Sequence, residues 1–151
     1  MAAGRTSAEL GALYQELILD HYRRPRNKGT LEKPDASVEI KNPLCGDEIR
    51  LQVAFDGDSL SDVRFSGRGC SISQASASMM TQLVKGKSTG EIDTIRNRFR
   101  DLMLGDSSLA DDPELGPLRS LSGVARFPAR VKCALLAWNA LESVLAEHDN
   151  Q

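Results

Sequence analysis

The sequence predicts an α+β fold, a two-layer domain in which a small three-stranded antiparallel sheet packs against helices. Two observations predict it. Between residues 38 and 65, apolar and polar side chains alternate in three short runs, the pattern of strands with one buried face. On both sides of these runs, apolar residues recur instead at three- and four-residue spacing, which is the pattern of amphipathic helices.

Three strands are expected in succession. The first and third are short and contain Val38 with Ile40, and Val63 with Phe65. The sequence "DGDS", residues 56–59, is typical of a hairpin turn between the second and third strands. Such a sheet has one apolar face and therefore needs a covering layer. The strictest alternation is that of the second strand, at Ile49, Leu51, Val53 and Phe55.

Four helices supply that layer. The first follows a capping-box pair, Thr6 and Glu9, and should end before Pro25, because proline disfavours the helical conformation of the residue before it. A second capping box, Ser88 with Glu91, opens the third helix. The apolar stripes of the second, third and fourth helices are Ile72, Ala75, Met79 and Leu83; Ile92, Ile95, Phe99 and Leu102; and Val131, Leu135, Trp138, Leu141 and Leu145.

The segment between the last two helices has no strong period and is rich in Gly, Ser, Asp and Pro. We expect a long connection at about residues 105–127, with one helical turn at most. Pro128 then suits the first turn of the final helix. No repeat divides the chain, so we expect a single domain over residues 1–151. Long connections in such domains are often functional.

Composition narrows the function. The chain has 151 residues, 40% of them hydrophobic and 26% charged, and a formal net charge of −2. This balance gives no basic footprint for nucleic acid or an anionic membrane, and no apolar run is long enough for a membrane span. The first ten residues lack the apolar core of a signal peptide, so we expect a cytoplasmic protein.

Three cysteines without a CxxC pair favour metal or thiol chemistry over disulfides.

The three cysteines lie at the ends of predicted elements. Cys45 lies in the loop before the second strand, followed by Gly46 and Asp47. Cys70 follows the third strand and precedes a helix, and Cys133 lies in the first turns of the last helix. Helix N-termini favour thiolates, and neighbouring ends at one sheet edge can converge. A shared metal site is therefore plausible, although free cysteines are usually small buried hydrophobes.

The two histidines give little support to other chemistries. His21 lies on the first helix and His148 near the end of the last, where solvated or packing roles are expected rather than metal ligation. A Cys–His hydrolase is disfavoured because no histidine lies in a loop suited to a general base. The residues alone leave a metal site and buried free thiols both open.

Four segments then resemble the blocks of one family. They are "ILDHYRRPRNKG", "NPLCGDEIRL", "GRGCSISQASASMM" and "FPARVKCALLAWNAL", and they are similar, in order, to the SufU branch of the IscU/NifU-N family of iron–sulfur assembly proteins. Scaffold-type IscU members have a histidine immediately before the third cysteine, and here that residue is Lys132. The long connection between the second and third cysteines is also a SufU feature. Both features favour the zinc-dependent sulfur-transfer branch.

The resemblance implies a site and a function. It makes Cys45, Asp47, Cys70 and Cys133 the ligands of one Zn²⁺, with the fold of SufU and IscU proteins. It implies a sulfur carrier that accepts persulfide sulfur from a pyridoxal-phosphate cysteine desulfurase of the SufS type and serves a downstream cluster assembly scaffold. We expect Cys45 to be the sulfur acceptor, because a loop beside a glycine moves at little cost.

Four anionic ligands around one dication leave a charge of −2, which calls for cationic neighbours. Arg130 and Lys132 are the expected ones. Arg130 is favoured because it lies one turn before Cys133 on the same helix face, whereas a solvated charged face is an equally good interpretation of Lys132. The first of two basic segments, "HYRRPRNK", is a candidate desulfurase interface, and the second, "RNRFR", is expected to be solvated surface.

Two alternative functions remain. One is a scaffold on which a [2Fe–2S] cluster is assembled, with iron in place of zinc. The other is a non-catalytic interaction domain that zinc only stabilises.

Overall fold

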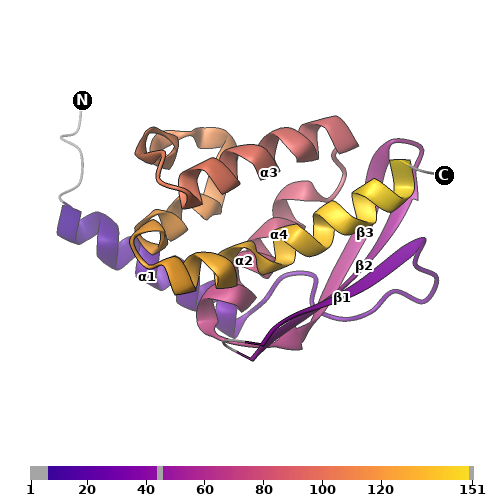
Figure 1. Cartoon of the computed structure of the whole chain (residues 1–151), viewed down its shortest axis with the longest axis horizontal. Coiled ribbons are helices and arrows are strands. Elements are labelled where there is room, and N and C mark those ends of the chain that lie inside the picture. The colour runs from indigo at the N-terminus through magenta and orange to yellow at the C-terminus, as the bar shows by residue number, and fades with distance from the viewer. Residues whose placement is uncertain (1–6, 44–45, 150–151) are drawn as a thin grey trace.

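Helices cover one face of a three-stranded antiparallel sheet, as the alternation predicted (Figure 1). The structure is a computed structural model and describes residues 7–43 and 46–149, with side chains from residue 11 onward. Its elements are α1 (Ser7–Arg23), β1 (Ala36–Asn42), β2 (Asp47–Asp56), β3 (Ser59–Arg68), α2 (Ser71–Val84), α3 (Thr89–Met103), the 3₁₀ helices η1 (Ser107–Asp111) and η2 (Pro113–Arg126), and α4 (Pro128–Asp149).

The sheet has the order β1-β2-β3, and its register aligns the predicted apolar residues. Leu51 of β2 lies between Val38 of β1 and Phe65 of β3, so the three side chains share the face that the helices cover. The opposite face carries charged pairs such as Arg50 with Glu39, at 2.9 Å. The hairpin predicted at residues 56–59 is confirmed, since β2 ends at Asp56 and β3 begins at Ser59.

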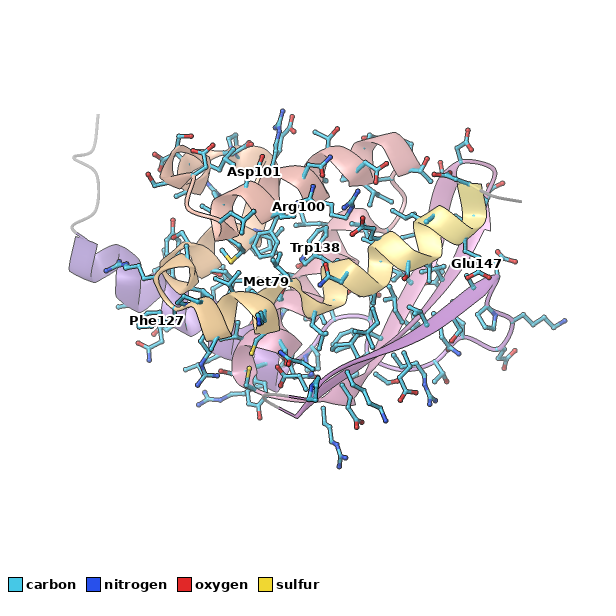
Figure 2. All side chains as sticks on the ribbon, in the orientation of Figure 1. Met79, Arg100, Asp101, Phe127, Trp138 and Glu147 are labelled. Carbon is cyan, nitrogen blue, oxygen red and sulfur yellow. The ribbon has the colours of Figure 1, made fainter. Side chains whose placement is uncertain are left out.

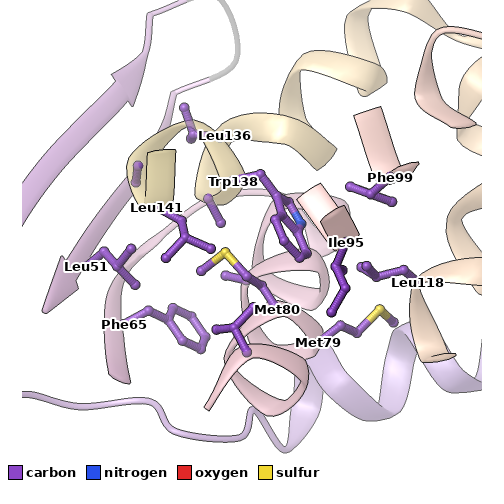
Figure 3. Close-up of a cluster of buried hydrophobic side chains, with 14 of the residues drawn as sticks. Leu51, Phe65, Met79, Met80, Ile95, Phe99, Leu118, Leu136, Trp138 and Leu141 are labelled. Carbon is purple, nitrogen blue, oxygen red and sulfur yellow. The ribbon is translucent and has the colours of Figure 1, made fainter. Parts of the chain in front are cut away.

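Helix α2 lies at the centre of the molecule and is buried around most of its circumference. It contacts α1, α4, η2 and β3, while α4 runs along β1 and β2. Its buried hydroxyls bond to neighbouring elements, as Ser76 shows by donating to the carbonyl of Ala134 on α4 at 2.6 Å. The core around α2 contains Leu51, Phe65, Met79, Met80, Phe99, Leu118, Trp138 and Leu141 (Figure 3).

Helix α1 ends at Arg23, before Pro25, as predicted. Its C-terminal end is fastened to α2 through Ser78, whose hydroxyl lies 2.8 Å from Nδ1 of His21 and 2.8 Å from the backbone N–H of Arg26. His21 is only 2% exposed, so the expectation of a packing histidine is confirmed. The following loop then bonds to the free edge of β3 at Phe65.

The segment expected as a long connection with one helical turn is instead largely helical. Residues 107–111 and 113–126 form 3₁₀ helices, interrupted at Gly116. The buried apolar side chains of η2 follow a spacing of three, the period of a 3₁₀ helix rather than of an α-helix or a strand. Because this period differs from the α-helical one, the sequence shows no α-helical spacing of apolar residues over η2. These side chains are Leu115, Leu118, Leu121 and Val124.

The capping box of Ser88 and Glu91 is confirmed: each side chain bonds to the backbone N–H of the other. The pair predicted at Thr6 and Glu9 lies partly outside the described residues and stays a prediction. Among the described helices, none combines the length and apolarity needed to cross a membrane.

Candidate metal centre

Three of the four predicted ligands converge at one end of the sheet. Asp47 is the first residue of β2, Cys70 is the N-cap of α2, and Cys133 lies in the second turn of α4. Their ligand atoms all lie within 4.8 Å of one another. The antiparallel hairpin explains the convergence of the first two, because it places the start of β2 beside the end of β3. The fourth predicted ligand, Cys45, lies outside the described residues.

The two carboxylate oxygens of Asp47 have different surroundings. Oδ1 accepts a hydrogen bond from the backbone N–H of Cys70 at 2.8 Å, whereas Oδ2 lies 3.8 Å from the Cys70 sulfur. The side chain is fully buried, at the N-terminus of the 14-residue helix α2, whose dipole favours a negative charge. The backbone therefore holds one oxygen and leaves the other turned toward the sulfur ligands.

Gly69 makes room for this carboxylate. A Cβ atom at residue 69 would overlap Oδ1 of Asp47 and would lie 2.6 Å from the hydroxyl oxygen of Ser73, closer than real Cβ contacts allow. The Ser73 hydroxyl in turn donates to the carbonyl of Cys70 at 3.1 Å. Gly69 and Ser73 lie in the family-like segment "GRGCSISQASASMM", but nothing in the sequence predicted a role for either residue.

Cys133 is the buried cysteine of the group, with 1% of its surface exposed. Its sulfur lies 3.6 Å from the carbonyl oxygen of Ala129, one turn earlier on α4. Burial alone would fit an ordinary core cysteine. The approach of a buried carboxylate and a second, partly exposed cysteine favours a metal site, because buried charges in proteins are paired or coordinate metals.

The two predicted cationic neighbours lie on the first turns of α4. Arg130 and Lys132 both have solvent-exposed side chains. Their proposed influence on the charge of the metal group therefore stays a prediction.

The donor set fits a soft or borderline metal. Thiolates select zinc or iron–sulfur clusters, whereas magnesium and calcium take oxygen ligands almost alone. Zinc requires four ligands in a tetrahedron. Asp47, Cys70 and Cys133 could supply three of them. Cys45 is two residues from Asp47 in the sequence and is the nearest further thiol along the chain.

Comparison with known families identifies the chain. The family model of the NifU-like N-terminal domain matches residues 13–150. The chain belongs to this family. It is 48% identical over 143 residues to the zinc-dependent sulfurtransferase SufU of Bacillus subtilis, covering 95% of this chain and 96% of that protein. It is 43% identical to the iron–sulfur cluster assembly scaffold protein IscU of Streptococcus pyogenes, covering 95% and 89%.

Solved structures support the same family. A crystal structure from Fervidobacterium islandicum, described as a putative iron–sulfur cluster assembly scaffold protein for the SUF system, is 37% identical, with a TM-score of 0.79 and coverage of 93% of this chain and 99% of that chain. A NifU-like protein from Brucella abortus, at 22% identity, shares the fold with a TM-score of 0.83. The family resemblance and the predicted α+β fold are thus confirmed.

Proposed function

We propose that this chain is a zinc-bound sulfur carrier for iron–sulfur cluster assembly. Its sulfur comes from a pyridoxal-phosphate cysteine desulfurase of the SufS type and goes on to a downstream assembly scaffold. The convergence of Asp47, Cys70 and Cys133 carries this proposal, because thiolates and a carboxylate form a zinc donor set. The similarity to the zinc-dependent sulfurtransferase of Bacillus subtilis supports zinc over iron.

Zinc would be held by Cys45, Asp47, Cys70 and Cys133, with residues 1–151 acting as one unit. When bound, it keeps its thiol ligands deprotonated at neutral pH. Reduced cysteines persist in a reducing compartment, which supports a cytoplasmic location.

The transfer itself is thiol exchange chemistry on Cys45. Its thiolate attacks the outer sulfur of the persulfide on the desulfurase, and a new S–S bond forms on Cys45. The S–S bond on the desulfurase breaks, and the desulfurase cysteine leaves as a thiolate. One sulfur atom moves and no external oxidant or reductant is consumed.

The described residues next to Cys45 in the sequence support its role as acceptor. Gly46 adopts a left-handed backbone conformation, with φ of 70°, and its N–H bonds to the carbonyl of Asn42 at 2.9 Å. This bond closes a turn whose ends bracket Cys45 in the sequence. Gly46 tolerates such a conformation without strain, so the backbone at Gly46 can change conformation at little cost.

A cluster scaffold is the second candidate. The IscU proteins of Streptococcus pyogenes and Escherichia coli, at 43% and 30% identity, are both named as iron–sulfur cluster assembly scaffolds. Lys132 stands against this reading, because scaffold-type members have a histidine at that position. A scaffold would be isolated with bound iron and colour, whereas a zinc protein is colourless.

The test combines metal analysis with mass spectrometry. Protein purified without chelators should contain one zinc per chain. After incubation with a cysteine desulfurase and cysteine, Cys45 should gain about 32 Da, the mass of one sulfur atom, and Cys45→Ser should gain none. Zinc without any sulfur uptake would instead support the interaction domain, and an increment on Cys70 or Cys133 alone would refute the role of Cys45.

A further inference from the structure

An open groove of about 910 Å³ lies between α1, η2 and the first residues of α2 and α4. It lies beside the metal group, because Ser71 in its wall follows Cys70 and Arg130 in its wall precedes Cys133 by three residues. The groove has the size of a cleft that encloses a ligand or several side chains. Its apolar wall includes Tyr14, Ile18, Ile72, Val124 and Phe127.

Phe127 is the prominent apolar residue of this groove. It joins η2 to α4 and is 61% exposed, an unusual state for a phenylalanine (Figure 2). Exposed aromatic side chains at the rim of an apolar groove are typical of binding surfaces. On α1, the wall continues with Ile18 and Tyr14, both partly buried.

The charge of the groove has one sign. Arg126 and Arg130 are the charged residues in its wall, and within the described part of the chain neither guanidinium forms an ion pair. Arginines elsewhere do form such pairs, for example Arg98 with Glu114 at 2.7 Å. The N-termini of α2 and α4 also lie at the groove and add partial positive charge. A chain with a net charge of −2 therefore presents a positively charged apolar groove beside its metal group.

We propose that this groove binds an acidic, apolar segment of the desulfurase. In this arrangement a bulky apolar side chain of the partner packs against Phe127 and Ile18, and a neighbouring carboxylate pairs with Arg126. The inference rests on the proposed function, because it assigns the docking site of the sulfur donor. The position of the groove supports this occupant: a segment bound there brings the donor protein next to the sulfur ligands.

The experiment measures binding of the zinc-loaded chain to a desulfurase whose catalytic cysteine is replaced by serine. Phe127→Ser and Arg126→Glu remove the apolar and the cationic contact. Leu104→Ser is the matched control for the first, because Leu104 is 71% exposed and lies outside the groove wall. Arg100→Glu, an exposed arginine of α3, is the control for the second.

Each groove variant should weaken binding about tenfold or more, with zinc content unchanged. Each control should change binding by less than about threefold. Arg126→Glu should also reduce the salt dependence of the affinity, since its charge contact is screened by salt. Groove variants that bind like the unaltered chain, or controls that lose as much, would overturn the proposal. A changed oligomeric state with unaltered desulfurase binding would assign the groove to a second copy and also overturn it.

Sulfur uptake from inorganic polysulfide separates this proposal from the proposed function. Polysulfide reaches the thiolates without a docked partner, so uptake from it reports on the carrier chemistry alone. If the unaltered chain takes no sulfur from either source, the carrier function fails, while the binding measurement still decides whether the groove is the docking site.

Discussion

Gly69→Ala should damage the metal centre without touching a ligand. The added methyl group would overlap Oδ1 of Asp47 and lie 2.6 Å from the Ser73 oxygen. Ordinary contact begins near 3.4 Å, so the Ser73 oxygen would have to withdraw by about 0.8 Å. A comparable shift of Asp47 would break its 2.8 Å bond to the backbone of Cys70. Overpacking of this kind costs about 1–3 kcal/mol, and a buried charged hydrogen bond contributes about 1.5–3 kcal/mol.

We therefore expect the metal-free Gly69→Ala variant to lose about 2–4 kcal/mol in its free energy of unfolding. Its zinc affinity should fall about 10–100-fold, the usual effect of changes that misplace a ligand. Urea unfolding and competition with a zinc chelator measure the two effects. Gly90→Ala is the matched control, because a Cβ atom at Gly90 meets nothing within 4 Å. If Gly69→Ala kept the zinc affinity of the control, the requirement for close approach to Asp47 would be refuted.

Three further predictions concern single side chains. Asp47→Asn keeps the shape of the residue but removes the charge, so zinc should dissociate faster in a chelator assay while the fold persists. An unchanged rate of dissociation would mean that Asp47 is not a ligand. Burial and the nearby charge of Arg26 lower the pKa of His21 to about 4. Between pH 6.5 and 4 the histidine is therefore protonated in the unfolded chain but neutral in the folded one. The metal-free protein should lose at most about 3 kcal/mol in its free energy of unfolding as the pH falls through this window. His21→Gln should reduce that loss in urea unfolding. Ser88→Ala removes the cap of α3 and should cost about 1 kcal/mol by the same measurement, and an unchanged value would show that the capping box of α3 contributes nothing.

Patterns local in sequence predicted most of the fold. Alternation located all three strands, because each has one face on the core and one in solvent. Proline and capping residues located the end of α1 and the start of α3. The 3₁₀ helix η2 was not predicted, since its buried leucines repeat every three residues and match neither the α-helical period nor the alternation of a strand.

The candidate site was predictable as far as its residue types allowed. The type and position of the cysteines made a shared metal site plausible, but only the family resemblance named Asp47, Cys70 and Cys133 as members of one ligand set. Gly69 was not predicted, because its importance lies in a distance to a carboxylate that only the folded chain brings near. The groove escaped for the same reason: its wall is assembled from helices α1, α2 and α4 together with η2.

The burial of the candidate ligands also limits which cysteine can accept sulfur from a partner protein. Asp47 and Cys133 are at most 1% exposed, and Cys133 is set in a helix packed on both the sheet and α2. A thiolate that must reach the persulfide of another protein cannot do so from that position without unpacking α4. Cys70 is partly exposed, but its backbone N–H donates to the carboxylate of Asp47, so moving Cys70 would also disturb that carboxylate. These constraints on Cys133 and Cys70 are the physical argument for expecting the transferred sulfur on Cys45, the remaining cysteine of the chain.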